Sequence, residues 1–300
     1  MISIIITYHN EGQGFMEECI KQLKETVDID HEVIIVDDCS ETPLAPIRGT
    51  RILRHEENKG VGAGFDTGVS YAKFDNVIIM GCDIRFFNNR WASRMHKEIE
   101  ANPFSLICTT CVGINKYYGA TLLLFHDRSN NRLKPDNFRG IFDAKWITDK
   151  PKGTAEVPCI LGAFYGVKKS WYNYVDGFWG HRQWGCLEPL ISMKSWLFGG
   201  NCLCVSDIET KHIFRRKSTH GIRQANILFN KMLTARLLFN DWERYIDFLG
   251  HNQDVDIAKG MLESLNTGRK REEYMRKRAR KVSHYTNRFN LDERCQKIER

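Results

Sequence analysis

The first forty residues constrain the fold more than any other part of the chain. Ile2 to Thr7 form a continuous, largely β-branched run, which is typical of a strand buried on both faces. Gln13 to Thr26 carry apolar residues at helical spacing, and a second apolar run follows at Glu32 to Asp38. A strand, a helix and a strand joined by short links predict a βαβ unit with parallel strands. We therefore expect an α/β sheet that binds its ligand at the carboxyl edge.

The size and composition of the chain fit one large globular domain with an appendage. It has 300 residues, of which 42% are hydrophobic and 27% are charged. No apolar run approaches the roughly 20 residues that a membrane-spanning helix needs. The chain begins directly with its strand-like run, without a charged leader, and its ten cysteines are scattered, several of them inside apolar runs. We therefore expect reduced thiols, no membrane span and a cytoplasmic location.

Polar side chains follow the two N-terminal strands, in the segments TYHNE, which begins at Thr7, and VDDCS, which ends at Ser40. A carboxylate at a strand end can accept hydrogen bonds from a uracil N–H or from ribose hydroxyls. In order and spacing, both segments resemble the first two signatures of family 2 glycosyltransferases and of the polypeptide GalNAc-transferases, which hold the nucleotide there. The resemblance implies nucleotide-sugar contacts from Thr7, His9, Glu11, Asp37 and Asp38. A solvated turn is the alternative for either segment taken alone.

Four glycines lie between residues 60 and 68 and superficially suggest a phosphate-binding loop. The lysine-containing P-loop pattern is absent, and the glycines do not follow the dinucleotide-binding order. The run resembles instead the NxGxxxAxNxG segment of family 2 enzymes, which implies donor contacts from Asn58, Gly60 and Asp66. Asp66 stands where that segment usually has asparagine. The alternative is a flexible loop that leads into a helix.

A third buried strand, Asn76 to Met80, leads into the segment GCDIRF. In the resembled families this strand precedes a DxD or DxH motif, whose side chains bind a divalent ion on the donor diphosphate. Asp83 matches the first position, Arg85 occupies the second, and the HIFR run that begins at His212 resembles the metal-binding HVFR of the GalNAc-transferases.

Two interpretations of this motif remain open. In the first, Asp83 and His212 bind Mg²⁺ or Mn²⁺, and the histidine favours Mn²⁺. In the second, Arg85 neutralises the diphosphate by bidentate contact, and the metal is weak or absent. In either case Arg215 can add positive charge beside His212.

The segment QWGCLEPLISMKSWLFGG, which starts at Gln183, places a carboxylate at the start of an apolar helix that ends in two glycines. It resembles the WGxE segment of GT-A glycosyltransferases, which implies donor contacts from Trp184 and Gly185. The glutamate of the family segment aligns with Leu187. Glu188 aligns with the next position, where inverting enzymes have their base aspartate and the retaining GalNAc-transferases have asparagine. The resemblance therefore implies that Glu188 is the catalytic base and that transfer is inverting. The alternative for Glu188 is a helix-dipole contact of about 0.5 kcal/mol.

A further segment, GAFYGVKK, begins at Gly162 and resembles the part of the family that shapes the donor sugar pocket. The matches run from residue 2 to about residue 245. They imply a GT-A fold, which is an α/β, Rossmann-like, mixed and mostly parallel sheet flanked by helices. From residue 218 the apolar residues take a helical period. We therefore expect a GT-A glycosyltransferase domain over 1–217 and a helical C-terminal extension over 218–300.

Most of the net charge of +7 comes from the segment 269–281, which holds eight basic residues and two glutamates. Tyr274, Tyr285 and Phe289 lie within it or just after it. A solvated helix face is the ordinary interpretation, but such a segment can also attract the phosphates of nucleic acid or of an anionic membrane surface. The nucleic-acid alternative predicts hydroxymethylated DNA bases as acceptors, as for some bacteriophage enzymes, beside glycan, glycolipid or protein acceptors.

The sequence thus predicts a metal-assisted glycosyltransferase that moves a sugar from a nucleotide sugar, expected to be a UDP-sugar, to a hydroxyl acceptor. One alternative is a degenerate GT-A domain that binds nucleotide or nucleic acid without turnover, which Arg85 and Leu187 support. Another is a nucleotidyltransferase, but the glycine-rich basic signature that such enzymes carry after the first strand is absent.

Overall fold

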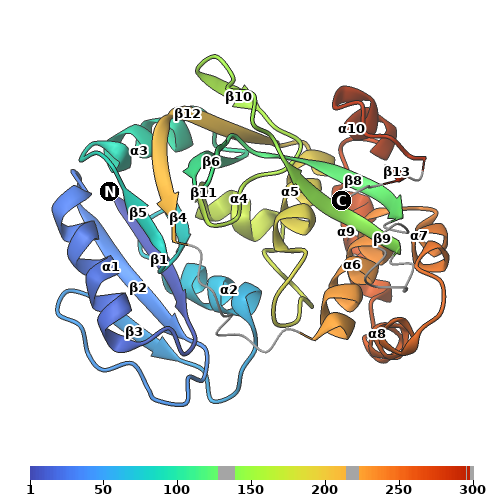
Figure 1. Ribbon diagram of the computed structural model, residues 1–300, viewed down its shortest axis with the longest axis horizontal. Coiled ribbons are helices and arrows are strands. Elements are labelled where there is room, and N and C mark those ends of the chain that lie inside the picture. The colour runs from blue at the N-terminus through green and yellow to red at the C-terminus, as the bar shows by residue number, and fades with distance from the viewer. Residues whose placement is uncertain (128–138, 214–222, 295, 298–300) are drawn as a thin grey trace.

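The computed structural model describes residues 1–127, 139–213, 223–294 and 296–297 (Figure 1). Its large sheet contains β1 (Ile2–Tyr8), β2 (His31–Asp37), β3 (Arg51–Arg54), β4 (Asn76–Gly81), β5 (Ile84–Phe86), β6 (Ser105–Val112), β7 (Lys116–Tyr117), β10 (Thr154–Glu156), β11 (Phe164–Lys168) and β12 (Asn201–His212). A small sheet contains β8 (Ala120–Asp127), β9 (Arg139–Trp146) and β13 (Gln296–Lys297). The helices are α1 (Gln13–Thr26), α2 (Val61–Tyr71), α3 (Trp91–Ala101), α4 (Lys169–Tyr174), α5 (Leu187–Leu197), α6 (Gln224–Leu238), α7 (Trp242–Phe248), α8 (Gln253–Ser264), α9 (Gly268–Lys277) and α10 (Val282–Arg288).

The large sheet is mixed, and its N-terminal strands β4, β1, β2 and β3 lie parallel to one another. Its strand order is β10-β12-β6-β11-β4-β1-β2-β3, with β5 beside β12 and β7 beside β6. β1 lies parallel between β2 and β4, so that β1, α1 and β2 form the predicted βαβ unit. β11 runs antiparallel between β4 and β6. Helices α1 and α3 cover one face of the sheet and α2, α4 and α5 the other, which confirms the predicted α/β class (Figure 1).

The register of the large sheet brings distant segments to one edge. Thr7, at the end of β1, pairs with Val36 on one side and with Gly81 on the other. β5 pairs antiparallel with the end of β12, where His212 lies opposite Ile84. The turn that leads into β5 therefore lies beside the end of β12, although the two are far apart in the sequence.

Helix α2 lies close to the sheet because of its glycines. A Cβ atom on Gly64 would lie 2.7 Å from Cγ2 of Thr7, and one on Gly68 would overlap the side chain of Ile5. Residues four apart share one face of a helix, so these two glycines face the sheet together. The glycine-rich run is therefore a packed helix from Val61 onward rather than a flexible loop.

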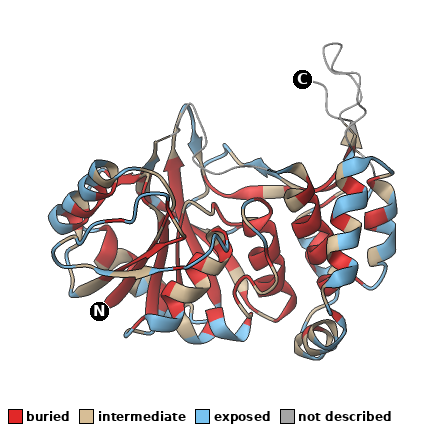
Figure 2. Cartoon of the chain, turned by 90° about the horizontal axis from the view of Figure 1, so that it is seen from below, coloured by how far each residue is buried: buried red, intermediate tan, exposed pale blue. Residues whose placement is uncertain are grey.

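The C-terminal helices share a hydrophobic core with the large sheet. One buried cluster includes Val36 and Val77 from the sheet, Leu190 from α5, Leu233 from α6 and Leu262 from α8. Figure 2 shows the buried residues continuing from the sheet into these helices. The predicted helical extension is therefore present, while the predicted domain boundary at 217/218 lies outside the described residues.

Two further expectations from the sequence concern the membrane and the thiols. Within the part of the chain that the structure describes, no helix is long and apolar enough to cross a membrane. The nine described cysteines are all free thiols, and all but Cys39 are buried, as their apolar surroundings predict.

The basic segment 269–281 is built into the fold. Arg271 and Arg278 donate hydrogen bonds to backbone carbonyl groups at the C-terminal end of α6. Arg280 donates to three carbonyl groups at the C-terminal end of α5. Tyr274 and Tyr285 are buried, with exposures of 0% and 1%, and so have no face on which a base can stack. This corrects the expectation of interleaved aromatic residues that stack on nucleic acid.

Substitution of Arg280 by methionine is expected to destabilise the protein, because three carbonyl groups at the end of α5 lose their charged donor. The expected loss is about 1–3 kcal/mol in the free energy of unfolding, measured by urea denaturation. Arg276→Met is the matched control, since Arg276 is exposed on the same segment and should change stability by less than about 0.5 kcal/mol. Equal effects of the two substitutions would contradict a capping role for Arg280.

Candidate active site

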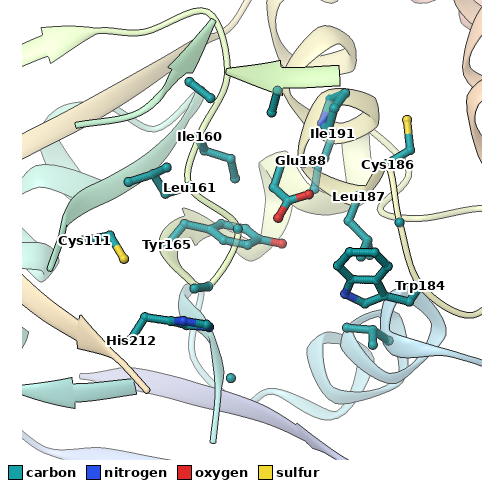
Figure 3. Close-up of a pocket in the computed structure, with 18 of the residues that line it drawn as sticks. Cys111, Ile160, Leu161, Tyr165, Trp184, Cys186, Leu187, Glu188, Ile191 and His212 are labelled. Carbon is teal, nitrogen blue, oxygen red and sulfur yellow. The ribbon is translucent and has the colours of Figure 1, made fainter. Parts of the chain in front are cut away.

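A cavity of about 730 Å³ lies at the carboxyl edge of β1 and β4. The sheet edge forms one wall, the turn into α5 forms another, and β9 with α6 forms a third (Figure 3). The predicted site residues that line it are Thr7, Glu11, Asp83, Gly162, Trp184, Gly185, Glu188 and His212. The cavity therefore joins the predicted metal pair to the predicted base.

Asp83 and His212 face each other at the sheet edge. The Nε2 atom of His212 lies 3.6 Å from Oδ2 of Asp83. The β5–β12 pairing and a 2.9 Å backbone hydrogen bond from Ile213 to the Asp83 carbonyl hold the two segments together. A carboxylate and an imidazole suit Mn²⁺, and the described residues contain no larger cluster of metal ligands, so an ion here would take further ligands from the donor or from water. Arg215, the predicted neighbouring cation, lies outside the described residues.

Arg85 does not line the cavity. Its guanidinium donates to the carbonyl groups of Cys82 and Ile84 at 2.8 and 2.9 Å and lies 5.0 Å from the centre of the Phe15 ring on α1. β5 begins only at Ile84, so Asp83 belongs to the preceding turn, and the same-face spacing of a regular strand does not apply to Asp83 and Arg85. Arg85 therefore holds this turn against α1, and the interpretation in which Arg85 neutralises the diphosphate stays a prediction.

Asp37 and Asp38 organise the loops beside the cavity. Asp37 accepts hydrogen bonds from two backbone N–H groups of the 40–44 loop, at 2.9 and 3.1 Å, and from an arginine of β3. Burial acts to raise the pKa of Asp37, but these donors outweigh burial and lower the pKa. Asp38 accepts from His55 at 2.7 Å and from the N–H groups of residues 59–60 at 2.9 and 2.7 Å. Both carboxylates thus position loops, and direct contact with a nucleoside stays a prediction.

His9 and Asn58 meet beside these loops. Nδ1 of His9 lies 2.8 Å from the carbonyl oxygen of Asp38, and Nδ2 of Asn58 lies 3.3 Å from each ring nitrogen of His9. The backbone N–H of His9 donates to the carboxylate of Glu11. These predicted residues therefore form one polar surface after β1, from which Glu11 reaches the cavity.

Gly60 and Asp66 stabilise the packing of α2. Gly60 has a φ angle of 92° and bridges to Gln183, and a side chain at Gly60 would overlap the backbone of Gln183. Asp66 accepts hydrogen bonds from the Tyr172 hydroxyl at 2.7 Å and from the Phe178 N–H at 3.0 Å, and burial raises its pKa. Asp66 does not line the cavity, so the structure gives it a packing role, and the implied donor contact stays a prediction.

The turn before α5 has an uncommon backbone conformation. Gln183, Gly185 and Cys186 have φ angles of 49°, 102° and 62°, in the left-handed region. Residues persist in this region where their surroundings fix them, and they are enriched at functional sites. Here Asn230 of α6 accepts from a backbone N–H of the turn at 2.9 Å and donates to two of its carbonyl groups at 2.8 and 3.1 Å. The turn thereby presents Trp184, which is 45% exposed, at the cavity.

Glu188 lies on the first turn of α5 and points into the cavity (Figure 3). Glu188 is partly buried, and this burial raises the pKa of its carboxyl group, although a hydrogen bond from its own N–H opposes the rise. A side chain at Gly162 would overlap Glu188, so the carboxyl group has room because residue 162 is glycine. A carboxyl group with a raised pKa in a cavity is a candidate for proton transfer.

The sequence reasoning missed two polar groups that line the cavity. The hydroxyl of Tyr165, in β11, is buried beside Glu188 and hydrogen-bonds to none of the described residues (Figure 3). Asp143 of β9 pairs with Lys231 of α6 at 2.7 Å and also with His126. Tyr165 and Lys231 have apolar neighbours in the sequence, which predict that both side chains are buried in the core. The signal that could have revealed them was a polar side chain at such a core position.

The chain is similar in sequence to known glycosyltransferases. A family model described as Glycosyl transferase family 2 matches residues 3–153. Human polypeptide N-acetylgalactosaminyltransferase 16 is 22% identical over 259 residues, and this match covers 81% of the chain and 46% of the relative. The chain therefore spans about half the length of the curated relatives it matches.

Solved structures share the fold. GalNAc-T7 in complex with UDP, GalNAc and Mn²⁺ superposes with a TM-score of 0.74 at 15% identity, over 96% of this chain and 56% of that one. The mannosyltransferase PcManGT from Pyrobaculum calidifontis, in complex with GDP-Man and Mn²⁺, gives a TM-score of 0.51 at 13% identity, over 92% and 73% of the two chains. These likenesses confirm the predicted GT-A fold, and the family model extends over half of the chain. The chain thus belongs to glycosyl transferase family 2, with a GT-A fold close to that of the polypeptide GalNAc-transferase catalytic domains.

Proposed function

We propose that this chain transfers a sugar from a UDP-sugar to a hydroxyl acceptor, with inversion at the anomeric carbon and with Glu188 as the base. The observation that carries the proposal is that the partly buried carboxyl group of Glu188 opens into the same cavity as Asp83 and His212. Membership of family 2 supports sugar transfer, and the UDP and Mn²⁺ named for the GalNAc-T7 structure support the donor and metal classes. The cytoplasmic location expected from the sequence stays a prediction.

Burial prepares Glu188 for proton transfer. Its raised pKa makes the ionised carboxylate a stronger base than that of an exposed glutamate. Glu188 takes the proton of the acceptor hydroxyl while the hydroxyl oxygen forms a bond to the anomeric carbon. The bond from that carbon to the diphosphate oxygen breaks, and its electron pair leaves with the nucleoside diphosphate. Attack from the face opposite the leaving group inverts the anomeric centre.

Asp83 and His212 are the side chains that would hold a divalent ion. When bound, such an ion neutralises the charge that develops on the departing diphosphate. The chain contributes the β5–β12 pairing that keeps both side chains at the cavity edge, where Thr7 and Glu11 also lie. Arg85, which occupies the second position of the metal motif, and Leu187 stay the two supports of the degenerate-domain alternative. The mechanism is the same for hydroxyls of glycans, glycolipids, proteins or hydroxymethylated bases.

Glu188→Gln is expected to lower kcat for transfer by about 10²–10⁴-fold, because an amide does not accept the proton. In the unsubstituted protein, kcat/KM should rise with pH through an apparent pKa above the ordinary glutamate value of about 4.3, because the base must be ionised. In the variant, kcat/KM should no longer rise with pH through this pKa. UDP release from a panel of UDP-sugars across pH measures both effects, and NMR of the product gives the anomeric outcome.

Glu263→Gln, on the exposed face of α8, is the matched control and should keep full activity. Full activity of Glu188→Gln as well would reduce Glu188 to a residue that stabilises the start of a helix. If the unsubstituted chain bound nucleotide but turned over no nucleotide sugar under any metal condition, the degenerate binding domain would replace the enzyme as the best account.

Removal of divalent metal with EDTA is expected to abolish transfer, and Mn²⁺ should restore it better than Mg²⁺, because one of the two ligands is histidine. Asp83→Asn should raise the Mn²⁺ concentration for half-maximal activity by more than about tenfold. Mn²⁺ binding in the presence of UDP, followed by electron paramagnetic resonance, checks the same point without turnover. Asp247→Asn, on the exposed face of α7, is the control, and equal Mn²⁺ affinity of the two variants would refute the assignment.

Tyr165→Phe is expected to leave the free energy of unfolding unchanged or to raise it by up to about 1 kcal/mol, because it removes a buried hydroxyl that no described residue satisfies. We expect kcat/KM for transfer to fall by roughly tenfold, since the hydroxyl is placed to donate to a bound sugar. Tyr172→Phe is the contrasting control, because its hydroxyl bonds to Asp66 and its loss should lower stability instead. A Tyr165→Phe variant with unchanged kinetics would place the hydroxyl outside the reaction.

A further inference from the structure

The cavity extends from the Asp83–His212 edge to a wall made by β9 and α6. Asp143 and Trp146 of β9 and Lys231 of α6 line this wall. In Figure 3, His212 and Trp184 lie on opposite sides of the cavity, with Tyr165 and Glu188 between them. A base must reach the acceptor hydroxyl while the donor stays at the diphosphate edge. The wall on the far side of Glu188 is therefore where an acceptor can lie.

The carboxylate of Asp143 lies in this wall, and positively charged partners within the chain already balance its charge. Its Oδ1 accepts a 2.7 Å hydrogen bond from Nζ of Lys231, and its Oδ2 pairs with Nε2 of His126. Lys231 is 4% exposed and His126 is fully buried. Burial acts to raise the pKa of Asp143, but His126 and Lys231 outweigh burial and lower it, so the carboxylate is ionised at neutral pH. A carboxylate has about four acceptor sites, so Asp143 can still accept hydrogen bonds from a ligand.

Aromatic rings line the same cavity as this carboxylate. Trp146 and Trp184 line the cavity and are 43% and 45% exposed. The ring of Tyr117 packs edge-on against Trp146, with the ring centres 4.3 Å apart and the planes at 71°. Phe142, from the same strand as Trp146, also lines the wall. The wall therefore combines broad apolar faces with a hydrogen-bond acceptor, as small-molecule sites do.

We infer that this wall is the acceptor subsite and that its acceptor is an uncharged pyranose, an inference that rests on the proposed sugar transfer. A pyranose has an apolar face of C–H groups that packs on an aromatic ring, and its edge carries hydroxyl donors for Asp143. An anionic acceptor gains nothing from Lys231, whose charge Asp143 already balances. Such an acceptor would also be repelled by the ionised carboxylate of the proposed base, Glu188, in the same cavity.

The same structure disfavours a nucleic-acid acceptor. Three arginines of the basic segment 269–281, Arg271, Arg278 and Arg280, cap the C-terminal ends of α5 and α6. The cavity is lined instead by the N-terminal halves of these helices, through residues such as Glu188 and Lys231. A duplex seated at the cavity would therefore not be held by those arginines.

The experiment measures acceptor use and donor hydrolysis separately. With the UDP-sugar that releases most UDP, the acceptors compared are a methyl glycoside of a neutral hexose, a methyl hexuronide and a duplex containing 5-hydroxymethylcytosine. We expect the neutral glycoside to raise UDP release at least about tenfold above donor hydrolysis, and the other two to leave it unchanged. Preference for the hexuronide or for the duplex would overturn the inference. Glycoside binding in the presence of UDP, followed by ligand-observed NMR, separates failure of this inference from failure of the proposed enzyme.

Trp146→Ala is expected to raise the KM for the neutral glycoside roughly tenfold, while donor hydrolysis stays within about twofold. Phe87→Ala, an exposed aromatic outside the cavity, is the matched control and should change neither value. Asp143→Asn alone leaves Lys231 buried without its partner and threatens folding. The double variant Asp143→Asn/Lys231→Met removes both charges together, and we expect it to fold and to lose the preference for the neutral glycoside. Unchanged acceptor kinetics in both the Trp146 and the double variant would refute the subsite.

Discussion

Helix α5 is buried along nearly its whole length, so the polar groups on it need partners inside the protein. Ser192 accepts a 3.1 Å hydrogen bond from a backbone N–H of the segment before β11. Lys194, whose pKa burial lowers to about 8, donates to two carbonyl groups of the turn after α4. These bonds fix α5 against its surroundings on several sides. The direction in which Glu188 leaves the helix is therefore set by the whole network rather than by the first turn alone.

The two ends of α5 explain why the sheet and the C-terminal helices depend on each other. At its start, the left-handed turn that Asn230 of α6 clamps aims Glu188 at the cavity. At its end, the N–H groups of Ala279 and Arg280 donate to the Leu197 carbonyl at 2.9 and 3.0 Å, and the Arg280 guanidinium binds three further carbonyl groups. The carbonyl groups at a helix end have no partner within the helix. A segment that lies beyond the sequence motifs, which end at about residue 245, thus completes the helix that carries the proposed base.

Local motifs were enough to predict the order of the elements and to single out Asp83, His212 and Glu188, which the structure places in one cavity. Each of these residues follows a strand, ends one or starts a helix, so its place follows from the element beside it. The directions of Arg85 and Asp66 could not be predicted in this way, because they depend on partners far away in the sequence and on where a strand begins. From its charge alone, we expected the basic segment to be a solvated surface. The carbonyl groups that it binds at the ends of α5 and α6 are brought to it only by tertiary packing, which the sequence does not reveal.

The polar groups in and beside the cavity are of two kinds: some already have hydrogen-bond partners within the chain, and others have none among the described residues. The carboxylates of Asp38 and Asp143 accept hydrogen bonds from the chain itself, and they keep loops and walls in place. The Tyr165 hydroxyl, by contrast, is buried with no partner among the described residues, and Glu188 retains a pKa raised by burial. A buried hydroxyl without a partner destabilises a protein by about 1–3 kcal/mol, and such a group is explained where a ligand satisfies it. We therefore propose that the donor sugar and the acceptor hydroxyl meet at the centre of the cavity, where these groups lie, while the hydrogen-bonded residues of the walls fix its shape.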